Sequence, residues 1–188
     1  HRAYAHYLEA KRAEAGGDLA AALVHLRQAL LYDESSPHIR FHLNRLRIRS
    51  GDREKGMAGL ERLVQEAPDF APALLLLGFS RRIEGRLESA AEAFERAIAI
   101  EPDFEEAYLA LLALRTELGQ YAEAEALAGR LAERRPGEGK AFRVISVLAK
   151  EKGEEGWSLR FLRKAVEAEP SHLPAVLDLA AREEQSGR

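Results

Sequence analysis

Two histidines four residues apart, His38 and His42, are the residues of this chain whose type and spacing come nearest to a metal site. Side chains at i and i+4 share one face of a helix, so both imidazoles could approach one ion. A site needs further ligands, and the same predicted helix carries no carboxylate and no other histidine. The chain has no cysteine, which excludes disulfides and thiol chemistry. We therefore expect no metal and no cofactor.

Other short motifs also fall short of a reaction centre. The segment 137–140 has the glycines and lysine of a phosphate-binding loop, but the glycines are too close together and Ala141 stands where a hydroxyl residue is needed. Ser80 lacks the second glycine of a nucleophile elbow. The adjacent carboxylates Glu105 and Glu106 begin a predicted helix, where the helix dipole favours negative charge. No catalytic residues are assigned, and the sequence predicts a protein that is not an enzyme.

Glycine and proline recur at a constant interval, which defines the elements that carry these side chains. Thirty-four residues is the period of a helix–turn–helix repeat. Glycine can end the first helix in the left-handed conformation, and proline stops the second. The first repeat is expected to have helices near 3–15 and 19–32. The glycines are Gly17, Gly51, Gly85, Gly119, Gly153 and Gly187, and the prolines are Pro68, Pro102, Pro136 and Pro170.

Small and apolar residues occupy matching positions in successive repeats. A position that is small in every repeat predicts a close helix crossing, because protein interiors leave no room for an extra methylene. Apolar residues four and seven positions further along share its face of the second helix. The small column is Ala22, Gly56, Ala90, Ala124 and Ser158; the first apolar column is Leu26, Leu60, Phe94, Ala128 and Leu162.

In its third repeat the chain resembles the tetratricopeptide repeat family, because Leu74, Leu77, Gly78, Ala90, Phe94, Ala97 and Pro102 follow the family's pattern in order. The resemblance covers the chain as five repeats and the leading helix of a sixth. It implies an all-α fold, a right-handed α-solenoid of stacked antiparallel helix pairs, as a single domain over 1–188. The expected repeats are 3–36, 37–70, 71–104, 105–138 and 139–172, followed by a final helix at 173–186.

Several positions depart from that pattern, and we expect locally adjusted packing there. Arg53 and Glu155 replace the usual large residue after the turn, and Leu112 occupies a normally small position. Trp157 is expected to fill the gap beside Glu155. Asp103, three residues before a glutamate, predicts a capping pair at the next helix.

The family resemblance also implies where a partner would bind, because first helices line the groove of such a solenoid. An apolar and aromatic floor flanked by cations predicts a protein or peptide partner that is apolar and carries acidic residues. The alternative is that the apolar side chains only pack between first helices and the arginines are solvated. The predicted groove residues are Tyr7, His38, Phe41, Arg45, Arg49, Leu75, Phe79, Arg82 and Leu109.

Two specialised binding modes of the family are absent from the sequence. A carboxylate clamp needs lysine, arginine and asparagine at fixed groove positions, where this chain has Tyr7, Lys11, His42, Pro72 and Leu76 instead. An asparagine ladder is excluded because Asn44 is the only asparagine.

Composition narrows the function classes further. The net charge of −3 argues against indiscriminate nucleic-acid binding. No apolar run has the length of a membrane span, and no targeting segment is found. The sequence predicts an interaction scaffold, from a bacterium by its Ala-, Arg- and Leu-rich composition, in the cytoplasm or the periplasm; the partner's identity and the oligomeric state stay open. The alternatives are a regulatory or substrate-recruiting segment of a larger enzyme, such as a bacterial transferase, and a self-assembly module. A chain that opens at His1 and stops at Arg188 is expected to be a piece of a longer protein.

Overall fold

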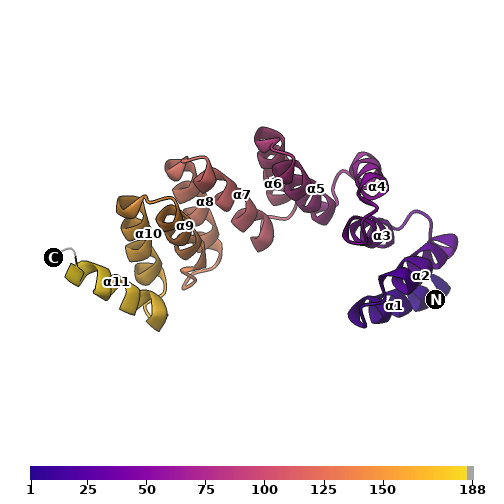
Figure 1. The fold of residues 1–188 in the computed structure, drawn as a ribbon, viewed down its shortest axis with the longest axis horizontal. Coiled ribbons are helices and arrows are strands. Elements are labelled where there is room, and N and C mark those ends of the chain that lie inside the picture. Colours follow the sequence, from indigo (N-terminus) through magenta and orange to yellow (C-terminus); the bar gives the residue numbers. More distant parts are fainter. Residues whose placement is uncertain (186–188) are drawn as a thin grey trace. The chain divides into compact units, whose positions relative to one another are not determined.

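The computed structural model describes residues 1–185, which form α-helices joined by short turns and contain no β-strand (Figure 1). In that part of the chain, no helix combines the length and the apolar character needed to cross a membrane. The helices are α1 (Arg2–Ala15), α2 (Leu19–Tyr32), α3 (Pro37–Arg49), α4 (Arg53–Glu66), α5 (Ala71–Ile83), α6 (Leu87–Ile100), α7 (Glu105–Glu117), α8 (Tyr121–Arg134), α9 (Lys140–Glu151), α10 (Glu155–Ala168) and α11 (Leu173–Gln185).

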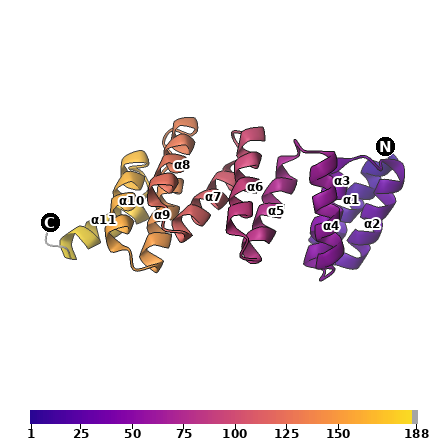
Figure 2. The same cartoon turned by 90° about the horizontal axis from the view of Figure 1, so that it is seen from above.

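The chain divides into two compact units, His1–Ile100 and Glu101–Arg188. In the first unit, α1 packs on α2, α3 on α4 and α5 on α6, and successive pairs contact one another. In the second unit, α7 pairs with α8 and α9 with α10, while α9 also contacts α7 and α8, and α11 packs on α10 (Figure 2). Each unit is therefore a stack of antiparallel helix pairs, and the predicted all-α solenoid class is confirmed.

The turns between paired helices depend on glycine. Five glycines of the predicted series lie at the ends of first helices, with φ between 74° and 96°. This is the left-handed region, in which a side chain is strained and glycine is not. Each second helix that precedes a proline of the series ends two residues before it, as α4 does at Glu66 before Pro68. The glycine and proline signals are thus confirmed; Gly187 lies outside the described residues.

The small column forms the helix crossings, as predicted. Ala22, Ala90, Ala124 and Ser158 are fully buried, and Gly56 is buried as well. The largest side chain beside them in the third repeat is Phe94, which is also fully buried. These crossings fix how each second helix lies against its first helix.

In the second repeat, Asn44 stands where most repeats have a small residue. It is buried, and its Oδ1 accepts a hydrogen bond from Arg47 Nη1 at 3.2 Å. A Cβ added at Gly59 would lie 2.2 Å from that Oδ1, and one at Gly56 would lie 2.8 Å from the Asn44 carbonyl oxygen. Gly59 therefore makes the room that the larger side chain on α3 requires, and Gly56 lets the backbones of α3 and α4 approach closely.

Two sequence predictions about the second unit had different outcomes. The predicted capping pair at Asp103 is wrong. Helix α7 begins at Glu105, and the residue before it, Phe104, makes no side-chain cap. The Asp103 carboxylate instead accepts a hydrogen bond from Arg134 at 2.9 Å. The Trp157 ring stacks on Tyr121 with 4.9 Å between the ring centroids, so it packs against α8; that it fills the gap beside Glu155 stays a prediction.

Candidate functional site

A continuous set of aromatic side chains runs from α1 over α3 to the start of α5; we call it the aromatic row. Its members are Tyr7, His42, Phe41 and Phe70. The ring centroids of Tyr7 and His42 are 5.3 Å apart, those of His42 and Phe41 5.5 Å, and those of Phe41 and Phe70 5.6 Å, all edge to face. All four side chains are partly exposed. The row therefore offers apolar surface that is already held in place by its own ring contacts.

A group of cations adjoins the aromatic row; we call it the cation cluster. Arg45 Nη2 lies 3.0 Å from Glu14 Oε1, Arg49 binds the same oxygen, and Lys11 Nζ lies 3.9 Å from Glu14 Oε2. Three positive charges thus face one carboxylate, which leaves a surplus of two. The Arg45 guanidinium also lies 6.0 Å from the centre of the Phe41 ring, within range of a cation–π contact. The cluster and the row are therefore joined.

The sequence predicts that Arg45 and Arg49 pair with the acidic groups of a partner. The structure gives both of them an acidic group within the chain, Glu14, from the neighbouring first helix. The Glu14 side chain retains only 16% of its exposure, while that of Arg49 retains 51%. The arginines are therefore held in a fixed arrangement, and Arg49 remains the more accessible of the two.

The remaining predicted groove residues lie on three helices. His38, on α3, is exposed and packs its ring edge to face on Phe70 at 4.9 Å. On α5, Leu75 and Arg82 are partly buried, and Phe79 is 37% exposed with its ring 5.3 Å from that of Phe94. Leu109 is partly buried on α7 and belongs to the second unit. The first unit thus holds eight of the nine predicted residues, which are Tyr7, His38, Phe41, Arg45, Arg49, Leu75, Phe79 and Arg82.

His42 is an uncharged aromatic member of the site. Burial, reinforced by the positive charges of Arg45 and Lys11, lowers its pKa from 6.5 to about 4. Its Nδ1 is buried and makes no hydrogen bond within the described residues. Burial also raises the pKa of the Tyr7 hydroxyl. In residues 1–185, no group of three His, Cys, Asp or Glu side chains could hold a metal ion.

Lowering the pH from about 6.5 to about 4 is expected to destabilise the fold through His42. The unfolded chain takes up a proton on this histidine near its ordinary pKa, whereas the folded chain does so only near pH 4. The unfolded state therefore binds more protons in that window, and the free energy of unfolding falls as the pH falls. Urea denaturation at a series of pH values measures the effect.

The variant His42→Phe is the control, because it keeps an aromatic ring at this position and removes the titration. Its unfolding free energy should fall less over the same pH range. An imidazole titration of His42 in the folded protein with a midpoint near 6.5, seen by NMR, would contradict this account.

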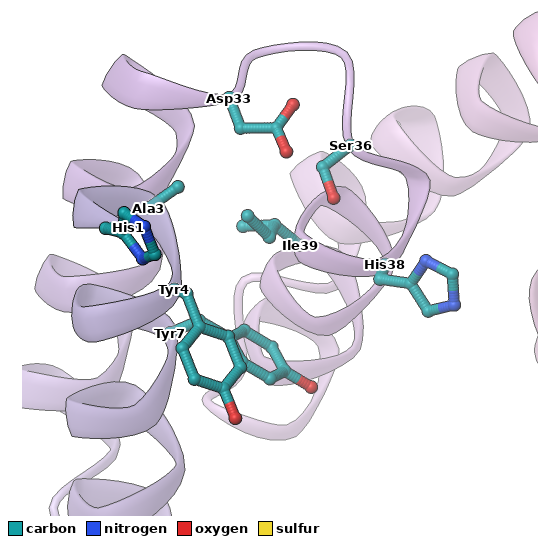
Figure 3. A pocket seen from close by; sticks show the side chains of 8 residues that line it. All are labelled: His1, Ala3, Tyr4, Tyr7, Asp33, Ser36, His38 and Ile39. Carbon is teal, nitrogen blue, oxygen red and sulfur yellow. The ribbon is translucent and has the colours of Figure 1, made fainter.

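A cavity of about 380 Å³ opens beside the aromatic row, between α1 and the start of α3. Figure 3 shows the Tyr4 and Tyr7 rings on one side, Asp33 and Ser36 in the connecting turn on the other, and Ile39 between them, with the His38 ring turned away. The Asp33 and Ser36 side chains form no hydrogen bond or ion pair with another group of residues 1–185. The cavity is lined by His1, Ala3, Tyr4, Tyr7, Asp33, Ser36, His38 and Ile39.

Ion pairs also join successive repeats in the second unit. Glu105 of α7 binds Arg135 at 2.6 Å and Lys140, and the hydrogen bond from Lys140 lowers the pKa of this carboxyl. Glu125 of α8 binds Arg160 at 2.9 Å and Lys164 at 2.6 Å on α10. These pairs link side chains about one repeat apart, as Glu14 does in the first unit.

The turn residues of the site, Phe70, Asp33 and Ser36, are not predicted from the sequence. Phe70 lies in the turn before α5, outside the helical positions that repeat from one unit to the next. The sequence pattern that could have revealed Phe70 is the recurrence of phenylalanine at Phe104, thirty-four residues later in the equivalent turn. Asp33 and Ser36 have no such signal, because neither residue type recurs thirty-four residues later.

Comparison with known proteins identifies the repeats. A family model described as "Tetratricopeptide repeat" matches residues 13–78 and 82–150. No curated protein sequence matches the chain.

Solved structures with the same fold include the MamA protein, at 20% identity and a TM-score of 0.68, covering 89% of this chain and 91% of MamA. TTC0263, a thermophilic TPR protein from Thermus thermophilus, is 19% identical with a TM-score of 0.63, covering 95% and 97% of the two chains. YrrB, described as a TPR protein with an unusual peptide-binding site, is 20% identical with a TM-score of 0.63, covering 90% and 87%. At these identities the likeness establishes the fold alone.

Proposed function

Because this chain belongs to the tetratricopeptide repeat family, we propose that it is an interaction scaffold that binds a peptide or helix of a partner protein on the first-helix face of residues 1–100. The partner segment is apolar and carries acidic residues. The fold is one that generally serves protein interaction, and YrrB is described as having a peptide-binding site. We assign the chain no catalytic step.

The observation that carries this proposal is the direct junction between the aromatic row and the cation cluster. Tyr7 contacts His42 on one side of the junction, and Arg45 reaches both Phe41 and Glu14 on the other. Large aromatic side chains and arginines are the residues that dominate interface energetics. Partly exposed apolar surface next to a positive surplus suits a segment that alternates apolar and acidic side chains.

In the proposed binding mechanism, the apolar residues and the arginines of the site have different roles. Phe41, Leu75 and Phe79 supply apolar surface that the partner covers, which removes that surface from water. Arg45 and Arg49 attract the partner's carboxylates, with Glu14 keeping their guanidinium groups in position. Because ring contacts and ion pairs already order these side chains, less conformational entropy is lost on binding.

A selection of random peptides on the immobilised protein tests the proposal. Selected peptides should be enriched in apolar residues together with Asp and Glu. Their affinity should fall about tenfold or more in Phe79→Ala, because truncation removes ring surface that is 37% exposed in the free protein. Isothermal titration calorimetry with one selected peptide, acetylated and amidated at its ends, gives the ratio.

The matched control is Leu31→Ala, which truncates an exposed apolar side chain on the second helix α2. This variant should bind the selected peptide as the unaltered chain does. Equal affinities of Phe79→Ala and the unaltered protein, or a selection without acidic and apolar enrichment, would remove the proposal.

A further inference from the structure

The cavity beside the aromatic row has a chemistry opposite to that of the cation cluster. Its walls are the rings of Tyr4 and Tyr7 and the side chain of Ile39, and its charged group is the carboxylate of Asp33 (Figure 3). No cation of the described residues pairs with Asp33, whereas Glu14 is bound by arginines. An unpaired carboxylate next to aromatic rings can bind a cationic side chain through an ion pair and cation–π contacts.

We propose that this cavity binds the side chain of a lysine or arginine in the partner segment. The methylene stem lies along Tyr4, Tyr7 and Ile39, and the charged end is held by Asp33, with the Ser36 hydroxyl as a second acceptor. A long cationic side chain buries its apolar stem while its head stays near water, which matches a cavity that is apolar inside and acidic at its rim. The tyrosine rings add cation–π attraction.

The proposal fixes the spacing between a basic and an acidic residue in the partner. Lys11 in the cation cluster lies seven positions after Tyr4 at the cavity along α1, a rise of about 10 Å. An extended peptide spans that distance in about three residues. The bound segment therefore carries a basic residue about three positions from an acidic one. This inference rests on the proposed function for its place in a partner, while the cavity's chemistry can be measured separately.

The test is an NMR titration of the isotope-labelled protein with Nα-acetyl-lysine methylamide. Saturable shifts are expected at the Ile39 methyl groups and the Ser36 amide, which lie in the cavity wall. The matched norleucine derivative has the same stem without the ammonium group and should bind about fivefold more weakly.

Two variants distinguish an effect of the Asp33 carboxylate on lysine binding from an effect that any surface carboxylate would have. Asp33→Asn should weaken lysine binding about fivefold without disturbing the fold, because the Asp33 side chain is bonded to no other group in residues 1–185. Asp69→Asn removes an exposed carboxylate from the next inter-repeat turn and should leave the affinity unchanged. The proposal is overturned if no saturable shift occurs, if norleucine binds as tightly as lysine, or if Asp33→Asn has no effect. None of these outcomes depends on whether peptides bind the aromatic row. A failure of the cavity proposal can therefore be distinguished from a failure of the proposed function.

Discussion

Replacing Phe94 by alanine is expected to lower the free energy of unfolding by about 3–5 kcal/mol. Phe94 is fully buried on α6. Its ring lies so close to α5 that a Cβ added at Gly78 would be 2.4 Å from the ring carbon Cε1. The substitution removes this contact and leaves a cavity between two helices whose backbones are too rigid to close it fully. Urea denaturation followed by circular dichroism measures the loss.

Phe79→Ala is the comparison for this experiment, because Phe79 contacts Phe94 but is 37% exposed. It should cost about 1 kcal/mol, since less surface returns to water. A Phe94→Ala variant as stable as Phe79→Ala would mean that the ring does not seal the α5–α6 crossing.

Neutralising the two sides of the Glu14 ion pair is expected to change peptide affinity in opposite directions. Arg45→Gln lowers the surplus of the cation cluster from two positive charges to one, whereas Glu14→Gln raises it to three. Binding of an acidic peptide from the selection should weaken about tenfold in the first variant and tighten in the second, where the gain in net positive charge outweighs the lost positioning of the arginines. The association rate should carry much of the change and should depend on salt, because exposed charges steer encounter.

Surface plasmon resonance at low and at high ionic strength separates the effect of net charge on binding from the effect of arginine positioning. Weaker binding in both variants would mean that Glu14 acts by fixing the geometry of Arg45 and Arg49, and that the net charge is secondary. Unchanged binding in Arg45→Gln would remove this arginine from the proposed interface.

The repeat architecture was predictable from sequence because the responsible residues have few alternatives. A left-handed backbone selects glycine, a helix end selects proline, and a close crossing selects a small side chain. Gly51, Pro68 and Ala90 follow these requirements in the structure. The capping prediction failed at Asp103 because several donors compete for one carboxylate, and the Arg134 guanidinium donates to it in place of a backbone N–H group.

The candidate site could be anticipated only by the types of its residues. Periodicity assigned Phe41 and Arg45 to the first helix of the second repeat, which the structure confirms. It did not reveal that Glu14 would hold Arg45 and Arg49, because that pairing depends on the lateral offset of two helices and on side-chain rotamers. The cavity at Asp33 needed coordinates for the same reason.

The fitted contact between Asn44 and the glycines of α4 limits how this array could be rearranged during evolution. In the third repeat the position equivalent to Gly59 is Ala93, which is buried. A recombination event that joined α3 to α6, the second helix of the third repeat, would set the amide of Asn44 against the methyl group of Ala93. The second repeat can therefore be duplicated or transferred only as an intact hairpin, although the thirty-four-residue period would permit exchange at any turn.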